Sequence, residues 1–297
     1  MSLGRRSFLL QAACVLAAGC RRASSDGVLD AGGRPRVVST SPSMTETLFA
    51  IGAGDFVVGR TSFCDYPPEA MKVPVVGGFT DLSVEAIVAL APTLVVGERR
   101  PGGRDLASDL QAKGIESFFP PMYTLAQIQE MVTTLGAKLG VSEKAAVVAS
   151  EIRARVAAVE AEVVSLPRPR VLLLFDFHPL VAAGPGAFPN ELLALAGAAN
   201  VVTTGGEYPH LSPEGVLALD PDIVIDGSAG AYPDPPAVLL NGVPGLSALR
   251  ALKVGSVVRL ATKTALRPGP RIGEGVAELA GLIHPGGAHR SMPRGGP

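Results

Sequence analysis

The sequence predicts an α/β fold of two similar lobes with mainly parallel sheets, joined by one long helix. The first observation behind this prediction is an internal repeat. Residues 82–97 (LSVEAIVALAPTLVVG) and 211–226 (LSPEGVLALDPDIVID) are identical at seven of sixteen positions without gaps. The second observation is a stretch between the halves with apolar residues at helical spacing. A repeat of this kind indicates that one structural unit occurs twice.

Each copy of the repeat has the start and stop signals of a helix followed by a strand. Ser83 and Ser212 lie at the start of the copies, each directly after the first leucine, and serine is a residue type that caps helix starts. Pro92 and Pro221 end the short helices, because proline disfavours helical conformation in the residue before it. The β-branched runs that follow suit buried parallel strands. Strands alternating with short helices imply two α/β lobes.

A second similarity lies earlier in each half. Residues 46–57 (ETLFAIGAGDFV) resemble residues 191–202 (ELLALAGAANVV), again with a helix, a Gly turn and a strand in that order. In the first copy, Ser43-x-x-Glu46 fits a capping box at the helix start. Chance similarity between Ala/Val/Leu-rich units is the weaker explanation, because both matches occur in the same order in the two halves.

The stretch between the halves, Glu143 to Ser165, predicts a stiff connecting helix. About 23 residues at about 1.5 Å each give about 34 Å, enough to cross both lobes. Pro167 and Pro169 then end the helix. Two lobes joined in this way should open and close little. The apolar stripe consists of Val148, Ile152, Val156, Val159 and Val163.

The first 19 residues predict an export signal. Arg5-Arg6 precede an apolar run that is shorter than the roughly 20 residues of a membrane-spanning helix, and the segment resembles a twin-arginine signal. Leu16-Ala17-Ala18-Gly19-Cys20 resembles a bacterial lipoprotein cleavage box. We therefore expect lipidation at Cys20 and an anchor in the periplasm or at the outer face of the cell membrane. Simple cleavage with an unmodified cysteine is the alternative.

These features divide the chain into six predicted segments. They are a signal peptide (1–19), a flexible tether (20–34), an N-terminal α/β lobe (35–142), the connecting helix (143–166), a C-terminal α/β lobe (167–285) and a disordered tail (286–297).

The composition excludes several classes of protein. Lys+Arg is 26 and Asp+Glu is 27, so the net charge of −1 leaves no electrostatic footprint for nucleic acid. The three cysteines, Cys14, Cys20 and Cys64, provide neither a disulfide framework nor a zinc cluster. None of the four histidines lies in the predicted first lobe, which disfavours a receptor for a bare divalent ion held between lobes.

The usual signatures of enzymes do not occur in the sequence. It contains no G-x-S-x-G, no G-x-x-x-x-G-K-[ST] and no H-E-x-x-H. We therefore predict no catalytic residue, no metal site and no resident cofactor. A hydrolase or metal-handling enzyme that reuses a two-lobe fold is the alternative from another class.

Arg36 to Gly97 resembles the first lobe of substrate-binding proteins of ABC importers. The most specific parts are the serine-rich start, the Asp65-Tyr66-Pro67-Pro68 segment and the paired Leu-x-x-Glu units. The resemblance covers residues 35–284 and is greatest to the cobalamin-binding members of the helical-backbone group (class III), which also includes iron-siderophore and haem receptors. It implies two lobes bridged by one long helix, a ligand between them, and a monomer that delivers a corrinoid to an ABC permease.

In this family one glutamate at the start of a surface helix on each lobe meets arginines of the permease. The matching positions are Glu85 and Glu214, the glutamate shared by the two copies of the repeat. The helix dipole favours a carboxylate in the first turn, and two spaced carboxylates offer bidentate sites to arginine. Helix stabilisation without any partner is the alternative explanation.

The resemblance also implies a set of ligand-binding residues. The family's Asp-Tyr-Pro tyrosine matches Tyr66, and the arginine of its late Arg-x-x-Pro-Arg segment matches Arg267. The other ring positions carried over are Phe79, Phe175 and Tyr208. Flat apolar side chains suit a corrin or porphyrin face, and arginine suits amide or carboxylate groups at the rim. The alternative for each ring is that it packs in the core or at the rim without contacting a ligand, and this alternative fits Phe175 best.

The sequence departs from the family in its large rings. It has no Trp, so Phe79 and Tyr208 replace both tryptophans, and another cleft phenylalanine of the family falls near Val181. This departure leaves haem or an iron-siderophore as the alternative ligand. His178 and Tyr208 are candidate haem iron ligands, because haem accepts His or Tyr.

Overall fold

The computed structural model describes residues 33–78, 81–99, 105–228 and 230–286. Several sequence predictions therefore lie outside the described residues: the signal peptide, the lipidation site Cys20, most of the tether, nearly all of the tail, and Phe79.

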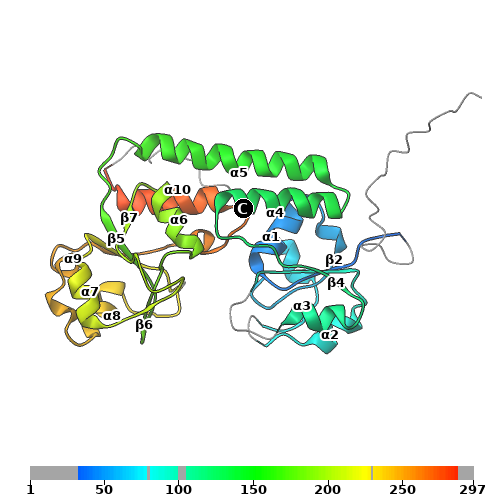
Figure 1. Cartoon of the computed structure of the whole chain (residues 1–297), viewed down its shortest axis with the longest axis horizontal. Coiled ribbons are helices and arrows are strands. Elements are labelled where there is room, and N and C mark those ends of the chain that lie inside the picture. Colours follow the sequence, from blue (N-terminus) through cyan, green and yellow to red (C-terminus); the bar gives the residue numbers. More distant parts are fainter. Residues whose placement is uncertain (1–32, 79–80, 100–104, 229, 287–297) are drawn as a thin grey trace, which may run out of the picture.

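The first lobe is built on a four-stranded, all-parallel sheet in the order β2-β1-β3-β4 (Figure 1). The strands are β1 (Val37–Ser39), β2 (Val57–Gly59), β3 (Leu94–Val96) and β4 (Glu116–Phe118). The helices are α1 (Pro42–Ala50), α2 (Val84–Ala89), α3 (Leu106–Gln111) and α4 (Leu125–Lys138), with short 3-10 turns at Gly54–Phe56 and Pro68–Lys72.

The second lobe has a six-stranded sheet in the order β10-β9-β5-β6-β8, with β7 paired to the start of β5. Strands β10, β9, β5 and β7 are parallel, whereas β6 and β8 return antiparallel. The strands are β5 (Arg170–Phe177), β6 (Leu180–Ala182), β7 (Ala199–Asn200), β8 (His210–Leu211), β9 (Ile223–Asp226) and β10 (Val257–Arg259). The helices are α6 (Phe188–Leu195), α7 (Pro213–Leu219), α8 (Pro236–Gly242), α9 (Arg250–Lys253) and α10 (Ile272–Ile283), with 3-10 turns at Leu246–Ala248 and Thr264–Leu266.

The internal repeat corresponds to one helix–strand unit in each lobe. The hydroxyl of Ser83 accepts a hydrogen bond from the Ala86 amide at 3.0 Å, and that of Ser212 accepts one from the Gly215 amide at 3.1 Å. These bonds satisfy backbone donors at the starts of α2 and α7. The predicted caps are therefore confirmed, and strands β3 and β9 follow as expected.

The long joining helix is α5 (Ser142–Val163). It runs along one side of the molecule and packs on α4 of the first lobe and on α10 and α6 of the second (Figure 1). Ile152, Val156 and Val159 of the predicted apolar stripe are buried, while Val148 is half-buried at the edge of the core. The predicted α/β fold of two lobes joined by one helix is confirmed.

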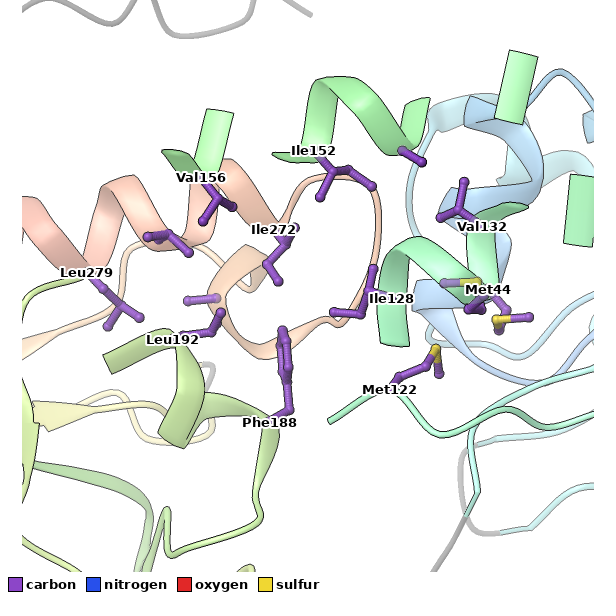
Figure 2. Packing of buried hydrophobic residues seen from close by; sticks show 14 of the residues in the cluster. Met44, Met122, Ile128, Val132, Ile152, Val156, Phe188, Leu192, Ile272 and Leu279 are labelled. Carbon is purple, nitrogen blue, oxygen red and sulfur yellow. The ribbon is translucent and has the colours of Figure 1, made fainter. Parts of the chain in front are cut away.

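A single apolar core continues from one lobe through α5 into the other (Figure 2). Its helical members lie on α1 and α4 of the first lobe, on α5, and on α6 and α10 of the second, and others lie on strands β1, β2, β3, β5 and β9. Labelled examples are Met44, Ile128, Val132, Ile152, Val156, Leu192, Ile272 and Leu279. Because interiors pack at high density and resist deformation, this core fixes the relative orientation of the lobes.

The predicted capping box is wrong. Helix α1 begins at Pro42 and is capped by Ser41, whose hydroxyl accepts a hydrogen bond from the Met44 amide at 3.3 Å. Proline suits the first helical position because its φ is already helical and it lacks an amide donor, so the cap lies two residues earlier than the box requires. Glu46 is therefore free of any capping role, and its carboxylate points to arginines of the second half.

Cys64 is buried next to the polar start of α1. Its sulfur accepts a hydrogen bond from the Thr45 hydroxyl at 3.0 Å and lies 3.2 Å from the Thr61 hydroxyl. The thiol is thus held by two threonine hydroxyls, directly before Asp65 and Tyr66 in the chain. Among the residues that the structure describes, no helix combines the length and apolar character needed to cross a membrane.

Candidate ligand-binding cleft

Two arginines from the end of the chain meet one buried glutamate of the first lobe. Arg267 Nη1 donates to Glu46 Oε1 at 2.8 Å. Arg271 binds the same carboxylate twice, with Nε to Oε2 and Nη2 to Oε1, both at 2.8 Å. The Glu46 side chain is only 2% exposed. A carboxylate this deeply buried is stable as an anion only when hydrogen bonds and opposite charge compensate it, and the two guanidinium groups do both.

The loop after Cys64 extends this network to the surface. Asp65 Oδ1 accepts a hydrogen bond from Arg267 Nη1 at 2.7 Å, and Lys263 Nζ lies 4.0 Å from Asp65 Oδ2. Partial burial acts to raise the pKa of Asp65, but the hydrogen bond and charge of Arg267 outweigh it and hold that pKa below its usual range. Asp65 therefore stays ionised and joins the lobes at neutral pH.

Tyr66 lies beside the same arginines. The guanidinium carbon of Arg271 is 3.8 Å from the centre of its ring, a cation–π stack. The residue is 43% exposed even though one face of the ring is covered. The structure thus brings the predicted residues Tyr66 and Arg267 into one cluster with Asp65 and Arg271.

On the second lobe, the rings of Phe175 and Tyr208 meet edge to face, with centroids 5.4 Å apart and planes at 75°. Phe175 is half-buried on β5, whereas Tyr208 is 47% exposed. Partial burial, together with the negative charges of Glu207 and Glu98, raises the pKa of Tyr208 to about 12. Because Glu98 follows β3, Tyr208 faces the first lobe.

The carboxyl edge of the second sheet carries further charged groups. Asp226, fully buried at the end of β9, accepts a hydrogen bond from Arg259 Nε at 2.6 Å. Asp176, near the end of β5, accepts one from the Tyr232 hydroxyl. Open α/β sheets bind ligands beyond the carboxyl ends of their strands. An open hollow of about 400 Å³ lies here, lined by Gly230, Arg259, Leu260, Ala261, Thr262 and Lys263.

The structure thus brings the four described ligand-binding candidates into two groups. Tyr66 and Arg267 form one group, and Phe175 and Tyr208 form the other; Phe79 falls outside the described residues. His178 is exposed, beside Asp176. None of the predicted residues lines the 400 Å³ hollow.

Sequence reasoning missed Glu46, Asp65 and Arg271. The available signal was the segment Arg267-Pro268-Gly269-Pro270-Arg271, in which two arginines flank a rigid turn, whereas the family resemblance points to its first arginine alone. Glu46 gave no separate signal, because its spacing from Ser43 suggested a capping box.

Glu85 and Glu214 are both exposed in the first turns of α2 and α7. The Ser83 hydroxyl also donates to Glu85 Oε2 at 3.3 Å. In Figure 1 both helices lie on the side of their lobe that is far from α5. The repeat therefore places one exposed glutamate of each lobe in the first turn of a helix that lies away from the joining helix.

Two rigidly joined α/β lobes, with aromatic and paired charged side chains facing one another between them, define a solute-binding protein. In the part of the chain that the structure describes, no group of three or more His, Cys, Asp or Glu side chains could hold a metal ion. Residues 37–264 match the family model described as "Periplasmic binding protein", and the chain belongs to this family. The family consists of non-enzymatic solute-binding proteins that act outside the cytoplasm.

Curated relatives and solved structures agree with this assignment. The chain is 36% identical over 198 residues to the vitamin B12-binding protein of Salmonella typhimurium, covering 66% of this chain and 74% of the relative. It is 32% identical over 263 residues to the cobalamin-binding protein of Halobacterium salinarum, covering 84% and 69%. A periplasmic heme-binding protein from Pseudomonas aeruginosa superposes with a TM-score of 0.75 at 28% identity, covering 87% of this chain and 96% of that one. The vitamin B12-binding protein BtuF of Vibrio cholerae shares the fold, with a TM-score of 0.70 at 24% identity and coverage of 84% and 96%.

Proposed function

We propose that this protein captures a corrinoid such as cobalamin between its lobes and delivers it to the permease of an ABC importer. The observation that carries the proposal is the presence of aromatic side chains on both lobes at the surfaces that face each other. Tyr66 belongs to the first lobe, and Tyr208 of the second lobe lies near Glu98 of the first. Flat rings on two sides suit the two faces of a corrin. Two relatives above 30% identity are named for vitamin B12 or cobalamin.

The charges between the lobes support a corrinoid over a ligand with several carboxylates. Arg267 and Arg271 already bind Glu46 and Asp65. A porphyrin carboxylate or an anionic ferric chelate would have to compete with these partners for the arginines. The amide groups at the rim of a corrin are neutral and need no such exchange. In this proposal the corrinoid is cargo, and the protein has no resident cofactor.

The permease contact is proposed at Glu85 and Glu214. Their exposure, their place in the first turns of two equivalent helices and their common side of the molecule support a symmetric pair of sites for permease arginines. We further propose that the protein acts as a monomer, anchored through a lipid on Cys20 after removal of residues 1–19. Mass spectrometry of the membrane-extracted protein tests the anchor, and a chain that begins at an unmodified Cys20 would contradict it.

Separate titrations with cyanocobalamin, haem and a ferric siderophore, followed by absorbance and heat, test the ligand. We expect saturable binding of cyanocobalamin at micromolar concentration or below, with one ligand per chain. Absence of cobalamin binding at these concentrations would refute the proposal. Haem is the second candidate, because solved structures at 28% and 29% identity are named heme-binding proteins. A strong shift of the Soret band without cobalamin binding would favour it.

A further inference from the structure

We propose that Glu46 is a positioning residue of the cleft: it holds Arg267 and Arg271, and Arg271 holds the ring of Tyr66 with one face open to the ligand. The ligand part of this inference rests on the proposed function. The internal geometry does not, because it is complete within the chain. Glu46 itself is too buried to touch a ligand, with 2% of its side chain exposed.

A short turn between Arg267 and Arg271 places both side chains next to the Glu46 carboxylate. Pro268 and Pro270 restrict φ on either side of Gly269. A Cβ on Gly269 would lie 3.3 Å from the carbonyl oxygen of Ser43, so the turn packs directly on the first turn of α1. Arg267 and Arg271 flank this contact and reach the next turn of α1, where Glu46 lies.

Three hydrogen bonds fix these groups relative to one another. Arg271 grips both oxygens of Glu46 in a bidentate pair, and Arg267 adds a third bond to Oε1. A planar guanidinium held by two parallel bonds cannot rotate without losing one of them. Glu46 therefore sets the plane of the Arg271 guanidinium.

That plane in turn supports Tyr66. The guanidinium lies 3.8 Å from the ring centre and covers one face, yet 43% of Tyr66 remains exposed. A ring fixed from one side is a preorganised surface for a second flat group, since less side-chain freedom is lost on binding. Tyr66 is thus the contact residue, and Glu46 and Arg271 act through it.

A double-mutant cycle tests this chain of contacts. The variants are Arg271→Met, Tyr66→Ala and the two combined, with cyanocobalamin affinity measured by calorimetry. We expect Arg271→Met to weaken binding about tenfold, equivalent to about 1.4 kcal/mol. On the Tyr66→Ala background the same substitution should change the affinity less than twofold. Equal losses on both backgrounds would overturn the proposal, because Arg271 would then act independently of Tyr66.

The tyrosine spectrum gives a readout that needs no ligand. The chain has no Trp and four Tyr, so its near-ultraviolet circular dichroism and emission report on tyrosines directly. Arg271→Met should change these spectra, and the change should vanish on the Tyr66→Ala background. The matched control is Arg250→Met, which removes an exposed arginine whose Nη2 lies 2.7 Å from Asp222 Oδ1, at the end of β9 opposite Asp226. It should alter neither spectrum nor affinity.

Glu46→Gln extends the test to the positioning residue itself. It keeps the shape of the side chain but removes the anion that Arg271 binds twice and one of the two carboxylate partners of Arg267, which can prevent folding. If the Glu46→Gln protein folds, we expect its near-ultraviolet circular dichroism and emission to match those of Arg271→Met. A folded Glu46→Gln protein with the parent spectrum would refute the role of Glu46. If the parent protein binds no cobalamin, the proposed ligand is wrong, while the spectra still decide whether Glu46 and Arg271 position Tyr66.

Discussion

Glu46 and Arg267 are 221 positions apart in the sequence, and their side chains are joined by a hydrogen bond of 2.8 Å. The pair links helix α1 of the first lobe to the segment that leads into α10. It is almost buried, with 2% and 11% of the two side chains exposed. Together with the continuous core through α5, it holds the surfaces of the cleft in one relative orientation.

Asp65→Asn should shift ligand preference toward carboxylate-bearing ligands. Asp65 is the exposed partner of Arg267, with 48% of its side chain exposed, so its loss frees part of the guanidinium while Glu46 remains. An exposed pair contributes up to about 1 kcal/mol, so we expect the ratio of haem to cobalamin affinity to rise by about fivefold or less. Competitive titration measures this ratio.

The matched control for this prediction is Asp222→Asn. Asp222 also pairs with an arginine, Arg250, at 2.7 Å, but it lies before β9, at the opposite end of that strand from the cleft. Asp222→Asn should leave the ratio of haem to cobalamin affinity unchanged. A fall in relative haem affinity for Asp65→Asn would contradict the assignment of Arg267 to the cleft.

Tyr208→Ala and Phe175→Ala should separate binding from packing. Tyr208 is 47% exposed, so its loss should weaken cobalamin binding by about tenfold with little effect on Tm. Phe175 packs against the main core, and its loss should lower Tm as well. Calorimetric titration and melting curves on the same samples provide both quantities. A fall in Tm for Tyr208→Ala without loss of affinity would assign that ring to structure instead.

Glu85→Ala combined with Glu214→Ala should stop cobalamin uptake by cells and spare cobalamin affinity. Both carboxylates are exposed at helix starts remote from the cleft residues, so the ligand site should not change. Uptake of labelled cobalamin and binding by the purified variant measure the two effects. The control is Glu143→Ala with Glu151→Ala, two exposed acids on α5. Normal uptake by the Glu85/Glu214 variant would refute the docking proposal.

Tyr232→Phe should lower thermal stability in a pH-dependent way. The amide of His178 and then the Tyr232 hydroxyl hold the pKa of Asp176 below its usual range. A carboxyl group whose pKa is lowered in the folded state stabilises the protein at pH values above its unfolded pKa of about 3.9. This stabilisation is lost as the pH falls through the folded pKa. We expect Tm to fall by roughly 1–3 °C at pH 7. This difference should shrink below pH of about 4. A constant difference from pH 7 to pH 3 would exclude the ionised Asp176 as the partner.

The two lobes should unfold in one transition, because the core is continuous through α5. Ile152→Ala, at the centre of that core, should cost about 2–5 kcal/mol and lower the single Tm. Val147→Ala on the exposed face of the same helix should stay within about 0.5 kcal/mol of the parent. Differential scanning calorimetry tests both, and two resolved transitions in the parent protein would contradict the prediction.

Much of the fold could be predicted because its signals are local. The caps Ser83 and Ser212, the prolines that follow the helices and the apolar stripe of α5 each act within a few residues. The spacing of these residues in the sequence therefore predicts the helices, the strands and the internal repeat. The candidate docking residues Glu85 and Glu214 come from the same repeat and hold equivalent places in α2 and α7.

The sequence by itself thus determined two α/β lobes and the long helix between them, and it placed Tyr66 and Arg267 among the candidate ligand-binding residues. Only the tertiary structure decided which groups neutralise one another. The sequence predicted that Glu46 is part of a helix cap and that Arg267 contacts a ligand. In the folded protein the two side chains instead bind each other at 2.8 Å. Periodicity and capping depend on neighbours in the chain, whereas a buried ion pair depends on which distant surfaces share a low-dielectric interior.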